Sequence, residues 1–522
     1  MEPRRGHDRS HRLRPGRQRL VRALAVVLTG LLTAGVACTP DSGGTPVDPG
    51  PGDTSLPAPT VRQGDGSVRL GWTVDAPAGA TYEWQWREYG TTVWSGATTA
   101  QPQVDATAGL RGGRLHWARV RYVADGTPGE WSSGKKFLYV DLTLPVVRID
   151  TAGEAPVVDK DVYLDATIGI DPNGAAYPAY SGTTRIKGRG NSTWSAPKKP
   201  YRLKLSAKAS LLGMPANRDW VLLADFFDPS HLRNEVAFQL SGRTGLAWTP
   251  RFRYVEVILN GSYDGLYLLG EHIEVDPDRV NIDEMSDTDV AGDSLTGGYL
   301  LEFDFHLNTN IEPGFISNEG VEIVIKDPDP PTPEQFDYIR NHINSFEAVV
   351  RSDTFTDPAT GYRAWLDVDA FLDWYFLAEL AKQQDSMWSS SYVTKPRNGK
   401  LTFGPVWDFD LSMGARNEFT PGWPADGWWI NLPFFGRWLP RLFEDPALKA
   451  QARERWNQLL PEFRSVVAGS TRPMRGSPRP DPPTRSVGGS HPRTSTPRRS
   501  SPSGSATVSP GSTQTSDPTG PA

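Results

Sequence analysis

The two ends of the chain limit where a folded core can form. Residues 39–55 consist mainly of Pro, Gly, Ser, Thr and Asp, and after about Ala468 the sequence contains no Leu, Ile, Phe, Tyr or Trp. Such stretches cannot bury enough apolar surface to offset the conformational entropy lost on folding. We therefore expect a disordered tether over 39–55, a disordered tail over 468–522 and all folded structure between them. The Ser, Pro, Thr and Arg bias of the tail either is native or results from an out-of-frame reading of GC-rich DNA.

The first 38 residues have the pattern of an export signal. Eight arginines between Arg4 and Arg22 precede an uncharged, mostly apolar run from Ala23 to Ala37, which is too short to span a bilayer comfortably. The run ends at Cys38, the only cysteine of the chain, so no intrachain disulfide can form. We expect an exported protein whose stability comes from packing.

The residues around Cys38 resemble a bacterial lipobox, in which the cysteine becomes the lipidated first residue of the mature protein. The sequence there is Leu-Thr-Ala-Gly-Val-Ala-Cys, with Gly35 where an aliphatic residue is usual. The segment is therefore either a lipoprotein signal or a site of simple signal peptidase cleavage. The first alternative predicts a protein anchored through Cys38 to the outer face of the cell membrane.

Residues 56–140 alternate apolar and polar side chains in short runs separated by turn residues. Val68, Leu70 and Trp72 share one face of such a run, and Tyr82, Trp84 and Trp86 share one face of the next. This period of two predicts β-strands, and the late Gly-Glu-Trp-Ser segment completes a resemblance to a fibronectin type III sandwich. The unit would be either a structural spacer or an adhesive, glycan-binding module.

Residues 144–467 mix strand and helix patterns without a repeat, which predicts an α+β domain. Helical spacing covers Ser230 to Gly242, with Ser230 as the expected N-cap, and Val368 to Gln383, with Asp367 or Asp369 as the expected N-cap. A further amphipathic helix is expected from Asp445 to Leu460. The strand-like runs are Val146 to Ile149, Tyr201 to Leu205, Trp220 to Ala224, Tyr254 to Leu259 and Gly298 to Phe305.

Three acids stand close to an expected crossing from helix to strand. Asp408 and Asp410 lie two apart in Phe-Gly-Pro-Val-Trp-Asp-Phe-Asp-Leu-Ser, a strand-like run, so both should point to one side and could bind one Mg²⁺. Asp385 ends the preceding Glu-Leu-Ala-Lys-Gln-Gln-Asp segment and would then be available as a base. Alternatively, the acid pair lies in a turn and Asp385 caps a helix.

A glycine-containing turn followed by a basic strand forms a second candidate site. The segment Arg-Ile-Lys-Gly-Arg-Gly-Asn-Ser-Thr-Trp contains Arg189 and Asn191, and Pro-Lys-Lys-Pro-Tyr-Arg-Leu-Lys-Leu follows it. Such a turn can offer backbone N–H groups to phosphate. Without further context, a bend with solvated lysines explains the same residues.

Five segments, in this order along the chain, resemble the spore-coat CotH kinase-like family: the Gly-containing turn and basic strand, Leu232-Arg233-Asn234, residues 260–269, residues 298–302, and residues 407–410. The resemblance covers most of residues 144–420. It implies an atypical protein-kinase-like core, and some family members transfer the γ-phosphoryl group of ATP to Ser or Thr of secreted or coat proteins.

The resemblance also implies roles for the acids. Asp385 matches the catalytic-loop aspartate, Asp408 matches the metal-binding aspartate, and Asp410 is a possible helper, with Mg²⁺ or Mn²⁺ as the ion. Ser390 stands where a kinase loop often carries a metal-binding Asn, which leaves the second metal position and the activity open.

The nucleotide-binding groups are assigned by analogy with protein kinases. Lys204, on the strand after the turn, is the expected nucleotide lysine, with Lys187 and Lys199 as rivals. Glu235 either pairs with that lysine or is a surface charge of its helix. Arg189 and Asn191 of the turn, together with Glu271, Glu302 and Lys326, complete the residues expected near the nucleotide.

Composition and motifs argue against several other classes. The formal net charge of −6 argues against a nucleic-acid-binding protein as a whole, although both ends are locally basic, and it gives no sign of a polyanion partner. The chain has no His-Glu-x-x-His pattern and no Gly-x-Ser-x-Gly elbow, which disfavours zinc and serine hydrolases. The alternative to a kinase is a non-catalytic cell-surface protein that binds wall polymer or a protein partner. Trp423, Trp428, Trp429 and Trp438 would then form either a sugar-stacking surface or part of the core.

Overall fold

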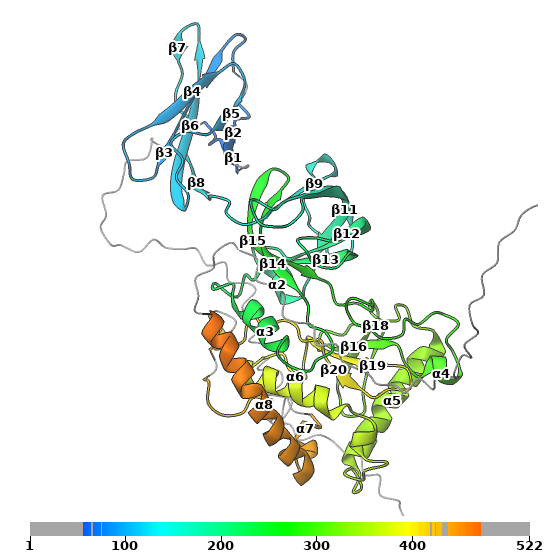
Figure 1. Ribbon diagram of the computed structural model, residues 1–522. Helices are drawn as coiled ribbons and strands as arrows, with labels where there is room; N and C mark the ends of the chain where they lie inside the picture. The colour runs from blue at the N-terminus through cyan, green and yellow to red at the C-terminus, as the bar shows by residue number, and fades with distance from the viewer. Residues whose placement is uncertain are drawn as a thin grey trace, which may run out of the picture. The chain divides into compact units, whose positions relative to one another are not determined.

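The computed structural model describes residues 56–63, 66–74, 76–417, 420–422, 424–430 and 437–470 (Figure 1). The export signal with Cys38, the tether over 39–55, Trp423 and the tail after Ser470 lie outside these residues. The described part is mixed α+β with more strands than helices, as expected. None of its helices combines the length and apolar character needed to cross a bilayer.

The first unit consists of two antiparallel sheets that share one hydrophobic core. One sheet has the order β1-β2-β5, and the other has the order β4-β3-β6-β7 with β8 also paired to β6. Alternate residues such as Trp84 on β3 and Val120 on β6 are fully buried, which explains the period of two in the sequence. The strands are β1 (Thr60–Gln63), β2 (Val68–Gly71), β3 (Thr81–Glu88), β4 (Ser95–Thr99), β5 (Gln103–Ala106), β6 (Arg114–Ala124), β7 (Thr127–Pro128) and β8 (Lys135–Tyr139). This agrees with an all-β unit, and the fibronectin type III likeness stays a prediction.

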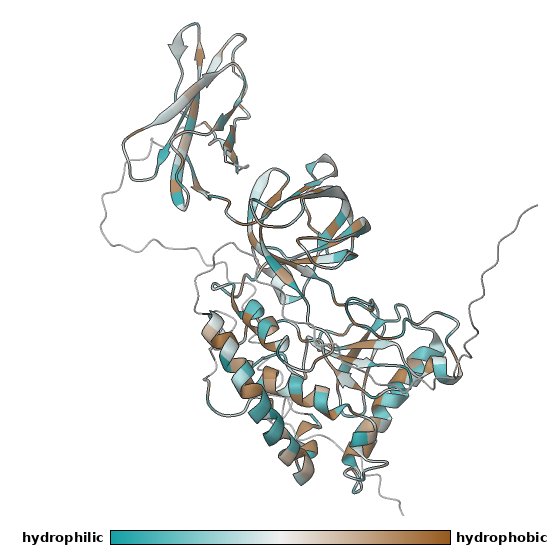
Figure 2. Ribbon diagram, in the orientation of Figure 1, coloured by the Kyte–Doolittle hydropathy of each residue, from teal (hydrophilic) through white to brown (hydrophobic). Residues whose placement is uncertain are grey.

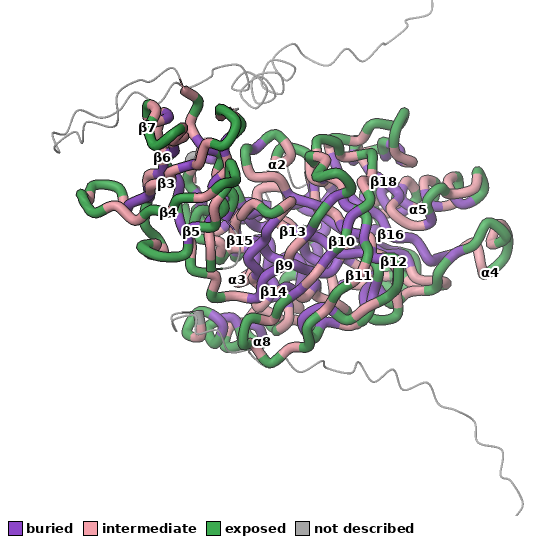
Figure 3. Tube along the Cα trace, turned by 90° about the horizontal axis from the view of Figure 1, so that it is seen from above, coloured by how far each residue is buried: buried purple, intermediate pink, exposed green. Residues whose placement is uncertain are grey.

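The chain then forms a closed barrel with the strand order β10-β11-β12-β13-β15-β14-β9. All its pairs are antiparallel except β14 with β9. Leu203 on β12, Trp220 on β13 and Leu269 on β15 fill the interior, so neighbouring residues such as Arg202 and Lys204 face outward. The strands are β9 (Val146–Thr151), β10 (Leu164–Asp171), β11 (Tyr180–Gly188), β12 (Tyr201–Ala209), β13 (Asn217–Leu223), β14 (Phe252–Leu259) and β15 (Ser262–Glu271). Buried positions follow these strands in Figure 3.

A second mixed region is built on a five-stranded sheet of order β17-β18-β16-β19-β20. Its central strand β16 is buried at all five positions, which explains its continuous apolar run. The strands are β16 (Tyr299–Phe303), β17 (Gly314–Ile316), β18 (Glu322–Asp327), β19 (Ser391–Lys395) and β20 (Thr402–Phe403), and the short pair β21 (Arg416–Asn417) and β22 (Thr420–Pro421) follows.

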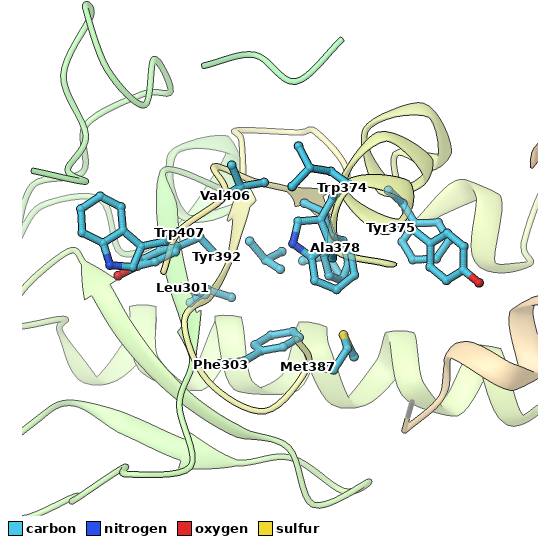
Figure 4. Close-up of a cluster of buried hydrophobic side chains, with 14 of the residues drawn as sticks. Leu301, Phe303, Trp374, Tyr375, Ala378, Met387, Tyr392, Val406 and Trp407 are labelled. Carbon is cyan, nitrogen blue, oxygen red and sulfur yellow. The ribbon is translucent and has the colours of Figure 1, made fainter. Parts of the chain in front are cut away.

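Three long helices complete this region, namely α5 (Pro333–Arg351), α6 (Val368–Ala381) and α8 (Pro446–Ser470). Trp374, Tyr375 and Ala378 of α6 belong to the same buried cluster as Leu301 and Phe303 of β16 (Figure 4). Helices α5 and α8 carry both hydrophilic and hydrophobic stretches (Figure 2), as expected for helices with one face in solvent. The helix predicted from Asp445 to Leu460 is present as α8, and it continues past Leu460 to Ser470. The shorter helices are η2 (Ala152–Glu154), α2 (Ser192–Ser195), α3 (Arg233–Ser241), α4 (Gly292–Leu295), η3 (Tyr362–Ala364) and α7 (Leu439–Leu442).

The two predicted helix starts have different outcomes. Asp367 caps α6 as predicted, because its carboxylate accepts the N–H groups of Asp369 and Ala370. The prediction of Ser230 for α3 is wrong, because that helix begins at Arg233. Asp228 supplies the oxygen instead and accepts the N–H groups of Leu232 and Arg233 at 3.0 and 2.9 Å. The Ser230 hydroxyl donates a hydrogen bond to the Asp228 carboxylate, so the serine supports the capping residue and does not cap the helix itself.

Candidate functional site

The turn after α6 holds the Trp-Asp-Phe-Asp loop in place. Lys382 has a left-handed conformation with φ 51°, which ends the helix and turns the chain. The Gln383 side chain then donates hydrogen bonds to the carbonyl oxygens of Trp407, at 3.0 Å, and Asp408. Gln384 donates to the carbonyl oxygen of Leu411 at 2.5 Å. These amide contacts bring Asp385 and the loop together, although they are far apart in the sequence.

The predicted strand through the loop is wrong, but the two loop acids still meet. The structure has no strand between residues 404 and 415, and Asp408 has φ 62°. The segment is a loop instead. Its backbone carbonyl groups accept hydrogen bonds from the glutamine side chains, so they do not need a neighbouring strand. Asp408 and Asp410 are still close together, because the charge of Asp408 contributes to the raised pKa of Asp410.

Burial and like charge raise the pKa of all three acids. Burial raises the pKa of Asp385 to about 7, and the charges of Asp408 and Asp304 add to this effect. Burial also raises the pKa of Asp408, against the opposing charge of Arg189. The pKa of Asp410 is raised well above its ordinary value by burial and by the charge of Asp408. The site therefore holds more negative charge than the local cations neutralise.

Asp304 is a member of this acid cluster that the sequence interpretation missed. It directly follows β16, is buried, and accepts a hydrogen bond from the Ser389 hydroxyl at 3.1 Å. The neighbouring Ser390 hydroxyl donates to Asp408 Oδ2 at 3.4 Å, a long contact. Asp304 lies two residues after Glu302 at the end of β16, and this spacing could have indicated that both side chains point to one side.

Two of the predicted nucleotide-binding cations lie at this site. The Arg189 guanidinium lies 5.3 Å from the centre of the Trp407 ring, and burial lowers its pKa while the charges of Tyr392, Asp408 and Glu302 oppose that effect. Lys326 Nζ lies 3.3 Å from Glu302 Oε2. Burial lowers the pKa of Lys326, but the charge of Glu302 outweighs this and the net direction is upward. Arg189 and Lys326 are thus the cations that the structure brings toward the acids.

The other predicted nucleotide-binding residues have different surroundings. Lys204 lies on the outer surface of the barrel, 3.9 Å from Asp219 Oδ2. Asn191 is exposed beside α2. Glu271 is fully buried and binds the Arg251 guanidinium through both oxygens, at 2.7 and 2.9 Å. In the described structure none of the three predicted residues makes a hydrogen bond or ion pair with the acid cluster, so their nucleotide-binding roles stay predictions.

The rival residues are also engaged in local contacts. Lys187 Nζ lies 4.9 Å from the centre of the Tyr163 ring. Lys199 donates to the carbonyl oxygen of Trp194 at 2.6 Å. Glu235 accepts a hydrogen bond from Gln239, one turn further along α3, at 2.6 Å. The last contact favours the interpretation of Glu235 as a charge on the helix surface.

The Leu-Arg-Asn segment at the start of α3 positions the loop from the other side. Asn234 donates to Asp225 Oδ1 at 2.9 Å and accepts the backbone N–H of Phe409 at 2.8 Å. Arg233 Nε donates to the carbonyl oxygen of Ser412 at 3.0 Å. The sequence marked this segment as part of the resemblance without giving it a role, and the structure assigns it the support of the acid loop.

Asp408 and Asp410 are the predicted metal-binding residues. Among the described residues, no three His, Cys, Asp or Glu side chains are grouped so as to hold a metal ion by themselves. Mg²⁺ in phosphoryl-transfer sites is commonly held by one or two carboxylates together with phosphate oxygens. A half-buried Asp408 next to a buried Asp410, both with raised pKa values, fits that arrangement, because a cation would stabilise their charged forms.

The tryptophans after the loop do not form one exposed surface. Trp429 and Trp438 are buried in the core, whereas Trp428 is 61% exposed. The backbone N–H groups of Trp429 and Ile430 donate to the carboxylate of Glu379. Core packing therefore accounts for two of the four tryptophans, and Trp423 lies outside the described residues.

Comparison with known proteins identifies the family of the chain. A family model described as CotH kinase protein matches residues 186–466, more than half of the chain. No match was found among curated proteins. The matched range includes Arg189, Lys326 and the acids at 385, 408 and 410, and the segment at the start of α3 that supports them. The chain belongs to the CotH kinase protein family.

Proposed function

We propose that this protein is an exported, CotH-like atypical protein kinase that transfers the γ-phosphoryl group of ATP to Ser or Thr of extracytoplasmic proteins. The observation that carries the proposal is the cluster of Asp385, Asp408 and Asp410, whose pKa values are raised by burial and mutual repulsion. Phosphoryl transfer requires a carboxylate pair for a metal and an acid near the acceptor hydroxyl. Family membership supports a kinase-related role for these residues.

Each residue has a defined part in the proposed reaction. Asp408 and Asp410 would hold Mg²⁺ or Mn²⁺, which when bound neutralises charge on the phosphates. Asp385 accepts the proton of the acceptor hydroxyl. The hydroxyl oxygen bonds to the γ-phosphorus, and the bond between the γ-phosphorus and the oxygen that bridges it to the β-phosphate breaks, which releases ADP. A pKa of about 7 suits Asp385 to that proton transfer near neutral pH.

The cations serve the phosphates in this proposal. Arg189 is planar and directs several N–H donors, so it is suited to two phosphate oxygens at once. Lys326 is held near the site by Glu302. Ser390 stands beside Asp408 at the second metal position and would supply a hydroxyl there, a weaker ligand than an amide oxygen. A lipid anchor on Cys38 would keep the enzyme at the outer face of the membrane.

Thermal melting of the full chain with and without Mg²⁺ and ATP tests nucleotide binding. At about one hundred times the dissociation constant, ligand binding adds about 2.7 kcal/mol of stability, which is a clear melting shift. Asp408→Ala should abolish the metal-dependent part of this shift. Asp165→Asn, a carboxylate change at an exposed position of β10, is the matched control and should leave the shift intact.

Phosphate transfer from labelled ATP to a mixture of extracytoplasmic proteins tests the chemistry. Asp385→Asn should retain the melting shift but lower transfer by about 10²–10⁴-fold, the usual contribution of a general base. A well-folded chain with no shift under any metal would contradict the kinase proposal. Retention on insoluble cell wall that survives Asp385→Asn would then favour the non-catalytic surface protein.

A further inference from the structure

A row of stacked arginine and tryptophan side chains covers one face of the N-terminal sandwich. We call it the arginine–tryptophan ladder, and it runs in the order Arg87, Trp94, Arg119, Trp131, Arg121. The distances from each guanidinium carbon to the ring centres are 4.6 and 4.4 Å at Trp94 and 4.2 and 4.3 Å at Trp131. Each indole is thus held between two guanidinium groups, which fixes the charges in a regular row.

Strand register places this ladder on the outer face of its sheet. Arg119 of β6 is opposite Gln85 of β3, and Arg121 is opposite Glu83. The residues between them along each strand, such as Val120 and Trp84, are fully buried in the core of the sandwich. Because side chains alternate across a strand, the arginines project to the side away from that core.

The central arginine of the ladder, Arg119, is hydrogen-bonded to a neutral side chain. Arg121 pairs with Glu83 at 2.6 Å, but Arg119 donates to Gln85 Oε1 at 2.7 Å, a neutral amide oxygen. Burial lowers the pKa of Arg119, and the positive charges of Arg87 and Arg121 lower it further, with only Glu83 opposing them. An anion at this face would relieve that repulsion.

The same face also has exposed aromatic and aliphatic groups next to the charges. Lys136 Nζ lies 4.2 Å from the centre of the Tyr89 ring, which in turn stacks on Trp117 at 6.1 Å. Leu115 and Leu138 are cross-strand neighbours and are 49% and 52% exposed. A sugar ring that carries an acidic group offers an apolar C–H face and an anionic edge, which match these two kinds of surface.

The net charge of the whole chain conceals this local surface. Residues 56–140 contain nine Lys and Arg against seven Asp and Glu, a formal net charge of +2, whereas the chain as a whole carries −6. We propose that the outer face of the β3-β6-β8 sheet binds an anionic polysaccharide, with the arginines of the ladder on its acidic groups. A repeating polymer suits the site because the charges repeat along the strands.

Binding of the full chain to immobilised polygalacturonate, with neutral dextran in parallel, tests this proposal. We expect retention on polygalacturonate that falls between about 50 and about 500 mM NaCl, because salt screens exposed charges. Little retention on dextran is expected. Arg119→Gln should weaken binding about tenfold, as for a charged contact at the centre of an interface.

Arg69→Gln is the matched control, because Arg69 lies on β2 of the other sheet and pairs with Asp105. It should change binding by less than about twofold, the size expected for an exposed charge outside the interface. Equal losses in the two variants, or equal binding of neutral dextran, would overturn the proposal. Binding of polyglutamate as tight as that of polygalacturonate would overturn the assignment to a sugar polymer in favour of an acidic peptide. Kinase activity is not involved, so the outcome is independent of the proposed function.

Discussion

The barrel and the acid cluster both contain buried carboxylates, but under opposite electrostatic conditions. Glu271 in the barrel is fully buried and receives two hydrogen bonds from the Arg251 guanidinium and one from its backbone N–H. Asp385, Asp408 and Asp410 all have raised pKa values, and the charge of Asp408 contributes to the rise at both Asp385 and Asp410. A buried carboxylate that is paired with a cation of the protein has a structural role. A carboxylate cluster with too few protein cations is typical of a functional site, where a bound cation can supply the missing positive charge.

Two other buried acids of the chain follow the barrel pattern. Asp373 on α6 binds the Arg455 guanidinium of α8 at 2.5 and 2.8 Å. Glu379, in the last turn of α6, pairs with Lys382 at 2.6 Å. Burial of an acid is therefore common in this fold, and it is the shortage of cations that sets the cluster apart.

Loss of the barrel pair should have the largest effect. Arg251→Met leaves the buried Glu271 carboxylate without its cation, and removing one partner of a buried pair costs about 3–5 kcal/mol. Chemical denaturation would measure this loss. The matched change Arg189→Met at the acid cluster should cost less, because the acids there already take up protons. Equal losses at the two positions would show that the contrast between them is not real.

The stability of the acid-rich region should depend on pH through Asp225, which lies next to the cluster. Burial raises the pKa of Asp225 to about 7, with the charge of Asp228 adding to the effect. The folded chain thus holds a proton that the unfolded chain releases above about pH 4. Stability from this group is full below that pH and is lost as the pH rises toward 7.

Asp225→Asn should remove this loss while its amide oxygen still accepts the hydrogen bond from Asn234. The advantage of the variant over the natural chain should grow by about 1 kcal/mol per pH unit between pH 4 and 7, and stay constant above. Denaturation curves at a series of pH values would measure it. Parallel pH profiles for the two chains would contradict the buried, protonated state of Asp225.

The smallest effect is expected at Ser390. Its φ of 51° is a conformation that Asn adopts readily, so Ser390→Asn should fold normally. The new amide oxygen would lie near Asp408 and provide a better ligand, lowering several-fold the Mg²⁺ concentration needed for the nucleotide-dependent melting shift. Ser390→Ala should shift that concentration in the opposite direction. Identical metal dependence in all three chains would remove Ser390 from the metal site.

Local patterns predicted most of the secondary structure but not the shape of the loop. The structure has strands at residues 81–88, where apolar and polar side chains alternate, and at residues 299–303, where all side chains are apolar or buried. Each pattern reflects whether one face or both faces of the strand are buried. The run around Asp408 became a loop, since Gln383, Gln384 and Asn234 bind its backbone groups. These contacts join residues 24 to 175 positions apart, so no local pattern contains them.

The sequence alone determined the α+β class and the family, narrowed the cap of α6 to Asp367 or Asp369, and predicted a site at Asp385, Asp408 and Asp410, because motif spacing and burial patterns are local properties. Tertiary structure decided which cations reach the acids. Lys204 and Glu271 have suitable chemistry but have local partners in the barrel. Arg189, beside Trp407, and Lys326, paired with Glu302, lie close enough for the charges of Asp408 and Asp304 to act on them. Electrostatic interaction depends on distance in space, and only folding sets that distance.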